Sequence, residues 1–349
     1  MMIPNNEPAH SDFALPVTQP QSIEDFFQDY WPALEARGWK SAILHSWKDL
    51  PERIDSDVDY VISGCGAAEL LGFLDGYCRD RGWRLVQMIE HEPGAFFCSC
   101  MQLGGDYRIL ALDVTWNYRR LGHALLPGSL LLEGRRRVHG KSFHIPSPGA
   151  ECAYILSKAA AKDKGFNLIR ERLFELLFED AENCVEVLNM ALGFRGRAHC
   201  DEERLCLEVE EWFADAPAFR KIRKGRRLGL AEASLYLRRM LQPTGLWLSF
   251  HGASFSQLPA GAKLTSMRPL FRQTYEYDRV IPLQVPKALA RVIRTSLVIE
   301  HSSGKSLSSS EWKMYLNTSH ESSRDHSLIE KVMEHMAERV DQRIRRMRS

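Results

Sequence analysis

The placement of three aspartates in strongly apolar stretches constrains the fold of this chain more than any other feature of its sequence. Asp57 and Asp59 stand at the start of the strand-like run 57–63 (DVDYVIS), and Asp113 lies inside the run 109–114 (ILALDV). Because side chains alternate along a strand, Asp57 and Asp59 leave the same face of a sheet. An unpaired charge within an apolar run is costly, so Asp113 needs a partner. If the two strands are neighbours, the three carboxylates meet.

Three carboxylates at one place would form a cation site. Carboxylates a few Å apart repel one another unless a cation lies between them, and a hard, oxygen-seeking ion such as Mg²⁺ suits them. Such a cage can hold two Mg²⁺ ions, which lower the pKa of an attacking hydroxyl and stabilise charge on a transferring phosphoryl group. Two structural interpretations stay open: the Asp-x-Asp pair can be turn chemistry, and backbone donors can satisfy Asp113.

The first part of the chain predicts an α+β domain. Residues 1–20 form a loose leader, and an amphipathic helix follows, with Ser22 as its cap and Gly38 as its stop. Five strand-like runs come next, with a helical run between the second and the third. They span residues 40–46, 57–63, 83–90, 95–103 and 107–116. This order predicts one mixed sheet with flanking helices over residues 21–148.

Two further parts are expected after Pro148. Apolar residues recur at helical spacing through residues 149–242, which predicts a helical module. From residue 243 strand-like and Ser-rich stretches return, and a basic, helix-compatible tail ends the part 243–349. No internal repeat is present in the sequence.

Composition and charge exclude several classes of protein. Lys plus Arg number 46 and Asp plus Glu 45, a balance that argues against a protein that coats polyanions along its whole surface. Basic runs at 135–141, 220–227 and 339–348 leave local contact with nucleic acid open, although it is not favoured. Without a long apolar run or an export signal, we expect a cytoplasmic protein with reduced cysteines. Cys98 and Cys100, even with His91 nearby, lack zinc-site spacing and are expected to be core thiols.

The stretch 44–62 resembles the signature of the DNA-polymerase-β-like nucleotidyltransferase superfamily. In that signature a Gly-Ser pair ends one strand, a loop follows, Asp-x-Asp opens the next strand, and a third Asp stands on a later strand. The resemblance covers about residues 38–165. It implies that Asp57 and Asp59 bind metal and nucleotide phosphates, that Asp113 binds metal and activates the acceptor, and that Ser46 hydrogen-bonds the β- or γ-phosphate. His45 replaces the glycine that allows close approach of the triphosphate; it either contacts a phosphate when protonated or has a structural role.

A second resemblance extends beyond the sheet. The stretch 154–164, with Lys158, Lys162 and Lys164, resembles the helix after the catalytic sheet in nucleotidyltransferase-like proteins from polysaccharide clusters. Lys158 is the candidate for a phosphate contact, because Lys162 lies one turn further on and is expected to be solvated; a plain surface lysine is the open alternative. Those proteins often continue into a thymidylate-kinase-like P-loop domain, and the lead-in LQPTGL at 241–246 resembles its start. No phosphate-binding loop follows: Lys263 is displaced from Gly252, and Gly304-Lys305-Ser306 lacks the upstream glycine. Residues 243–349 are therefore expected to be a degenerate kinase-like α/β segment without ATP chemistry.

Together these patterns favour a Mg²⁺-dependent nucleotidyltransferase that moves a nucleoside monophosphate from a nucleoside triphosphate to an acceptor hydroxyl or phosphate. The acceptor (a sugar phosphate, an RNA end or a protein hydroxyl), the choice of triphosphate and the oligomeric state stay open. One alternative is a non-catalytic scaffold or regulator that retains the fold, with a partner surface in its C-terminal segment. Another is a toxin-like enzyme that modifies tRNA or protein.

Overall fold

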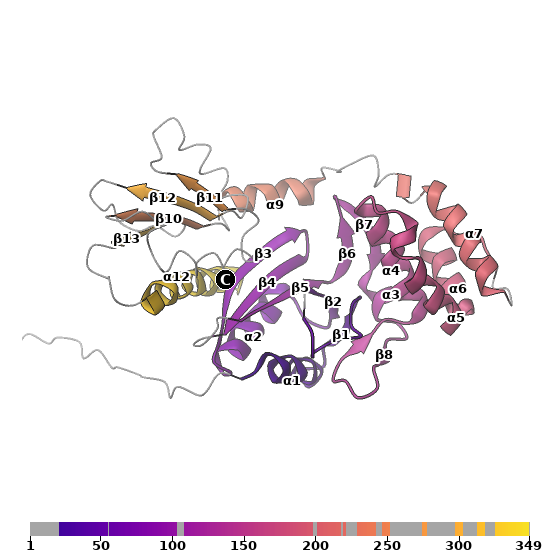
Figure 1. Cartoon of the computed structure of the whole chain (residues 1–349), viewed down its shortest axis with the longest axis horizontal. Coiled ribbons are helices and arrows are strands. Elements are labelled where there is room, and N and C mark those ends of the chain that lie inside the picture. The colour runs from indigo at the N-terminus through magenta and orange to yellow at the C-terminus, as the bar shows by residue number, and fades with distance from the viewer. Residues whose placement is uncertain are drawn as a thin grey trace, which may run out of the picture.

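The computed structural model describes residues 21–348, apart from 55, 103–107, 198–200, 218, 221–228, 242–245, 252–273, 278–296, 303–312 and 318–324. It is a mixed α+β protein with a five-stranded sheet and flanking helices (Figure 1). The loop positions Gly252, Lys263, Gly304, Lys305 and Ser306 discussed above lie outside the described residues.

The five strand-like runs of the N-terminal part all form strands of one mixed sheet, in the order β1-β2-β5-β4-β3. Strands β2 and β5 pair in parallel, and the other neighbouring pairs are antiparallel. Helix α1 begins after Ser22, whose Oγ accepts a hydrogen bond from the backbone amide of Asp25, as the cap prediction required. The elements are α1 (Ile23–Glu35), β1 (Lys40–Ile43), β2 (Val58–Ser63), α2 (Ala67–Arg79), β3 (Trp83–Glu92), β4 (Ala95–Gln102) and β5 (Ile109–Thr115).

One face of this sheet is covered by helices from both ends of the chain. Aromatic residues of α1, such as Phe26 and Trp31, and apolar residues of α2 share one core cluster with alternate residues of β2 and β5, including Tyr60 and Leu112. Val340 and Ile344 of α12 (Asp325–Arg348) belong to the same cluster. The basic tail was expected to be helical, and it is; it packs against β3 and α2.

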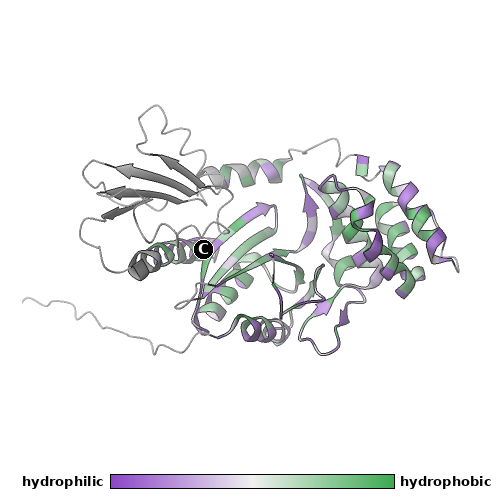
Figure 2. Cartoon of the chain, in the orientation of Figure 1, coloured by the Kyte–Doolittle hydropathy of each residue, from purple (hydrophilic) through white to green (hydrophobic). Residues whose placement is uncertain are grey.

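Short elements that the sequence patterns did not reveal connect the sheet to the helical module. They are β6 (Asn117–Arg120), β7 (His123–Pro127), α3 (Gly128–Leu132), β8 (Arg136–Arg137) and β9 (His144–Ile145). The module itself contains α4 (Pro148–Ala161), the 3₁₀ turn η1 (Phe166–Leu168), α5 (Arg170–Glu179), α6 (Ala181–Leu192), α7 (Glu202–Asp215) and α9 (Leu230–Leu241). A second core cluster joins α4–α7 to Ala42, Leu44 and Val61 of the sheet region. Figure 2 shows apolar residues concentrated on the sheet strands and through the helical module.

Four strands of the C-terminal part form a separate sheet in which every pairing is parallel. They are β10 (Leu246–His251), β11 (Thr274–Tyr277), β12 (Leu297–Ser302) and β13 (Lys313–Asn317), in the order β11-β12-β10-β13. The strand-like stretches expected after residue 243 therefore do form strands, among them 246–251 and 297–302. Among the helices that the structure describes, none combines the length and apolar character needed to cross a membrane.

Candidate functional site

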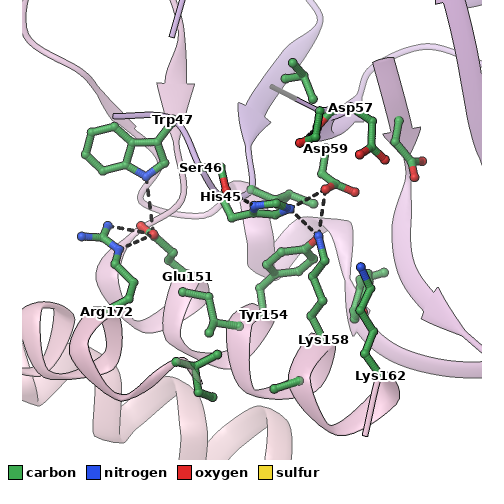
Figure 3. Close-up of a pocket in the computed structure, with 18 of the residues that line it drawn as sticks. His45, Ser46, Trp47, Asp57, Asp59, Glu151, Tyr154, Lys158, Lys162 and Arg172 are labelled. Carbon is green, nitrogen blue, oxygen red and sulfur yellow. Dashed lines mark hydrogen bonds and ion pairs between the residues drawn. The ribbon is translucent and has the colours of Figure 1, made fainter. Parts of the chain in front are cut away.

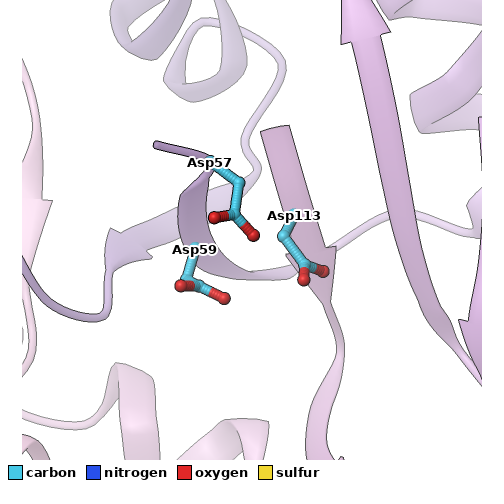
Figure 4. A group of neighbouring side chains, drawn as sticks. All are labelled: Asp57, Asp59 and Asp113. Carbon is cyan, nitrogen blue, oxygen red and sulfur yellow. The ribbon is translucent and has the colours of Figure 1, made fainter. Parts of the chain in front are cut away.

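Asp57, Asp59 and Asp113 meet on one face of the first sheet. One carboxylate oxygen from each lies within 4.8 Å of the others, and Figure 4 shows the three side chains facing a common space. The meeting follows from the parallel pairing of β2 with β5, which sets Asp59 directly beside Asp113. Because Tyr60 and Leu112 point into the α1–α2 core, the alternation of side chains directs Asp59 and Asp113 to the opposite face. The geometric prediction is confirmed.

Two basic groups contact Asp59. The Lys158 ammonium donates a 2.8 Å hydrogen bond to Asp59 Oδ2, and His45 Nε2 pairs with the same oxygen (Figure 3). Burial raises the pKa of Asp59, but the hydrogen bond with His45 and the charge of Lys158 outweigh it, so the pKa lies well below its usual range. Asp59 is therefore ionised at neutral pH, as a metal site requires.

His45 connects Asp59 to the end of β1. Its Nδ1 lies 2.7 Å from Ser46 Oγ, and its ring stacks on Tyr154 with ring centroids 5.9 Å apart. Ser46 has a φ of 55°, a left-handed backbone conformation that is uncommon outside glycine and that marks a tight turn. His45 thus has defined contacts in this chain, and these contacts place its ring between Ser46 and Lys158.

Asp113 has a different partner. His91, on the edge strand β3 two strands away from β5, lies with its Nε2 2.8 Å from Asp113 Oδ1. Burial raises the pKa of Asp113, the His91 hydrogen bond lowers it, and the charges of Asp59 and Asp57 add to the rise, so the net shift is upward. Burial disfavours the charged form of His91, but the hydrogen bond and charge of Asp113 outweigh this and raise the pKa of His91. His91 had been considered only beside the cysteines, and its role here follows from the sheet order.

Helix α4 supplies the wall that faces the carboxylates. Its residues Glu151, Tyr154 and Lys158, and Lys162 directly after its end, recur at helical spacing and all line the same cavity (Figure 3). Sequence reasoning selected Lys158, set Lys162 aside as solvated, and gave no role to Glu151 or Tyr154. The signal that could have found them is this i, i+3, i+4 recurrence, which continues one turn on either side of Lys158.

The cavity has a volume of about 1020 Å³, and it contains all six residues selected from the sequence: Asp57, Asp59, Asp113, Ser46, His45 and Lys158. At another part of its wall, buried Glu151 accepts two hydrogen bonds from Arg172, at 2.9 and 2.7 Å. The Arg172 guanidinium also lies 5.3 Å from the ring centroid of Trp47. This polar network joins the loop after β1 to α4 and α5. A cavity of this size accommodates a nucleotide-sized ligand.

The remaining candidates from the sequence do not form sites among the described residues. Cys98 and Cys100 are buried core thiols, as expected, and burial contributes to the raised pKa of each. Residues of the basic run 135–141 are engaged internally: Arg135 pairs with Glu35, and Lys141 pairs with Glu52. In the run 339–348, Arg343 donates a hydrogen bond to the backbone carbonyl of Met88. Most of the run 220–227 lies outside the described residues.

Comparison of the chain with protein-family models, with curated proteins and with solved structures finds no match in any of the three.

Proposed function

We propose that the protein is a Mg²⁺-dependent nucleotidyltransferase that moves a nucleoside monophosphate from a nucleoside triphosphate to an acceptor hydroxyl or phosphate. The observation that carries this proposal is the convergence of Asp57, Asp59 and Asp113 within 4.8 Å inside a cavity of about 1020 Å³. Mutually repelling carboxylates at the wall of a ligand-sized cavity favour a cation-assisted reaction of an anionic substrate.

The donor set fits Mg²⁺. It consists of three carboxylates from two adjacent strands, and hard oxygen ligands are those that Mg²⁺ prefers. Asp57 and Asp59 would bind one ion together, and Asp113 would complete a two-ion site. Bound there, the ions would neutralise charge on the transferring phosphoryl group and favour deprotonation of the acceptor.

The side chains around the cluster suit an in-line displacement. The acceptor oxygen forms a bond to the α-phosphorus, the bond from that phosphorus to pyrophosphate breaks, and the acceptor proton passes to Asp113. Ser46 and Lys158 would hold the leaving phosphates; their position in the cavity wall next to His45 supports this role. Positioning and electrostatic stabilisation would supply the rate enhancement, without a covalent intermediate.

One observation favours the alternative of a non-catalytic protein that retains the fold. Asp59 Oδ2 already pairs with both His45 and Lys158, so binding of a metal at this oxygen would compete with two internal contacts. A regulator or scaffold could keep these contacts permanently. Measuring the binding of Mg²⁺ and nucleotide distinguishes the enzyme from the non-catalytic protein. Only in the enzyme must His45 and Lys158 leave Asp59 and contact phosphate instead.

The C-terminal sheet supports a kinase-like interpretation of residues 243–349. An all-parallel sheet is typical of α/β units, and here the first strand of the part, β10, lies between the third and the fourth. We propose that this part contributes packing and a partner surface rather than ATP chemistry, because its loops lack the spacing of a phosphate-binding motif.

The test is transfer of label from α-³²P-labelled nucleoside triphosphates in Mg²⁺ to three acceptor classes: sugar phosphates, tRNA and protein. Mg²⁺-dependent binding of each triphosphate is first followed by thermal shift. We expect one triphosphate to stabilise the wild type and to transfer label. Asp57→Asn should abolish both effects, since it removes one carboxylate of the cluster. Asp49→Asn is the matched control, because Asp49 lines the cavity but is not part of the cluster.

Three outcomes are distinct. Transfer lost in Asp57→Asn and kept in Asp49→Asn supports the enzyme. If expression of the protein arrests growth and Asp57→Ala relieves the arrest, the protein is the toxin-like enzyme that the sequence left as an alternative. If no triphosphate stabilises the protein in Mg²⁺, the nucleotidyltransferase proposal is wrong and the non-catalytic alternative replaces it.

A further inference from the structure

The cations that line the cavity fall into two groups. Four have a carboxylate partner in the structure: Lys48 pairs with Glu175, Arg119 with Glu232, Lys158 with Asp59, and Arg172 with Glu151. Arg120, Lys162 and Lys164 also line the cavity. Within the described part of the chain, no ion pair or side-chain hydrogen bond involves any of these three.

The three unpartnered cations lie close to one another although they come from different elements. Arg120 is the last residue of β6, and Lys162 and Lys164 follow the end of α4. Burial lowers the pKa of Lys162, and the positive charges of Lys158, Arg120 and Lys164 lower it further, while Asp59 opposes them. Among the described residues, the structure therefore gathers three cations here that have no ion-pair partner of their own.

Arg120 is the member of this group whose position is least expected without a ligand. Its side chain is half-buried, and a cation withdrawn from water without a partner loses hydration free energy that nothing else restores. Its neighbour Arg119 has an ion-pair partner, because its guanidinium lies 2.9 Å from the carboxylate of Glu232. Nearby Glu92 accepts a hydrogen bond from the backbone amide of Leu121 instead. A planar guanidinium matches the geometry of a phosphate group, which would supply the missing charge.

The location of this group indicates which part of the substrate it meets. The charge of Arg120 acts on His91, the partner of Asp113, so Arg120 lies on the Asp113 side of the cluster. Ser46, expected to hold the leaving phosphates, contacts His45 on the Asp59 side. Figure 3 shows Lys162 on the far side of Lys158 from Ser46. In the proposed reaction, the side of Asp113 is where the acceptor loses its proton.

We propose that Arg120 and Lys162, with Lys164 beside them, bind a phosphate group carried by the acceptor, at a place separate from the triphosphate of the nucleotide. This inference rests on the proposed nucleotidyltransferase function and narrows it. It selects phosphorylated acceptors, such as a sugar phosphate or the phosphate at an RNA end, over a neutral hydroxyl of a protein.

The experiment measures the affinity of the full chain for inorganic phosphate, the simplest probe of this site. Calorimetric titrations are run in Mg²⁺, with and without a saturating non-hydrolysable α,β-methylene analogue of the triphosphate that binds. We expect phosphate to bind in both conditions. Arg120→Gln and Lys162→Gln should each weaken phosphate binding at least about tenfold, a typical effect of losing a charge-assisted contact, and leave analogue affinity within about twofold. Arg120→Lys should lose less phosphate affinity than Arg120→Gln, because lysine keeps the positive charge.

Lys40→Gln is the matched control, since it removes one positive charge from an exposed residue outside the cavity. It should not change phosphate affinity. Arg120→Gln should also keep its melting temperature, because an unpartnered cation contributes no pairing energy to the fold; a clear fall would mean that Arg120 is structural and would overturn the proposal. Displacement of phosphate by the nucleotide analogue would also overturn it, because the cations would then belong to the triphosphate site. If no triphosphate binds, the proposed function fails, and the effect of Arg120→Gln on phosphate affinity still decides whether an anion site exists.

Discussion

Asparagine substitutions at Asp59 and Asp57 should have opposite effects on the stability of the metal-free protein. From the sequence alone, removal of either carboxylate predicts an unchanged or raised melting temperature, because like charges repel. The structure separates the two residues. Asp59 pairs with the half-buried Lys158 at 2.8 Å and with His45, whereas Asp57 is exposed. Asp59→Asn leaves Lys158 without its counter-charge, and Asp57→Asn only relieves repulsion.

The size of the Asp59 effect follows from the burial of the pair. The side chains of Lys158 and Asp59 are 20% and 16% exposed. The energy of this ion pair should therefore lie between that of a fully exposed pair and that of a fully buried pair. Exposed pairs contribute about 0.2–1 kcal/mol, and removing one partner of a fully buried pair costs about 3–5 kcal/mol. We therefore expect a loss of about 1–3 kcal/mol for Asp59→Asn. At about 2–4 °C per kcal/mol for a domain of 150–250 residues, this lowers the melting temperature by about 2–12 °C.

The ion pair of Asp59 also predicts how the stability difference between wild type and Asp59→Asn depends on pH. The pKa of Asp59 is lower in the folded protein than in the unfolded chain, where it is about 3.9. Its contribution to stability is thus present above that pH and is lost as the pH falls through the folded pKa. The difference in stability between wild type and Asp59→Asn should persist at neutral and mildly acidic pH and shrink below about pH 4.

The assay is thermal unfolding of wild type, Asp57→Asn and Asp59→Asn in EDTA across this pH range, with circular dichroism to verify the fold. Asp57→Asn should melt at the wild-type temperature or slightly above it. The reasoning is refuted if Asp59→Asn is as stable as wild type, or if Asp57→Asn is the more destabilised variant. Either result would mean that the contacts of Lys158 and His45 with Asp59 do not stabilise the fold.

Three other changes test how the site is held. In Gly149→Ala the new Cβ would lie 2.3 Å from the backbone oxygen of Asn183, so α4 must shift from α6; we expect a loss of about 1–3 kcal/mol in urea denaturation and weaker nucleotide binding. Glu151→Ala removes the buried partner of Arg172, whose side chain is 24% exposed and keeps its pair with Glu175, so it should cost about 1–3 kcal/mol in the same assay; an unchanged stability would contradict this. Truncation that removes residues 325–349 should uncover the apolar surface of β3 and α2 that α12 covers. The truncated protein should therefore bind more of an apolar dye and be less soluble. A soluble truncated protein without dye binding would show that α12 is dispensable.

Local patterns in the sequence were sufficient for the elements and for the residue types of the site. The alternation in the run 57–63 predicted that Asp57 and Asp59 share a face, and the apolar run around Asp113 predicted that this carboxylate needs a partner. Ser22 and Gly38 marked the ends of the first helix region because capping depends on only a few neighbouring residues. Such features depend on local backbone geometry, which a short stretch of sequence specifies.

Only the tertiary structure decided what each of these residues meets. Two strands, β3 and β4, lie between Asp59 and Asp113 in the sequence. The two residues come together only because β5 inserts between β2 and β4 in the sheet, and no local sequence pattern specifies this insertion. Likewise, helical spacing shows that Lys158 and Lys162 share a face of α4, but not that this face covers the carboxylates. His91 reaches Asp113, and α12 reaches β3, through pairings between distant segments. These contacts arise from the burial of whole faces against one another, and burial is a property of the assembled fold rather than of a short stretch of chain.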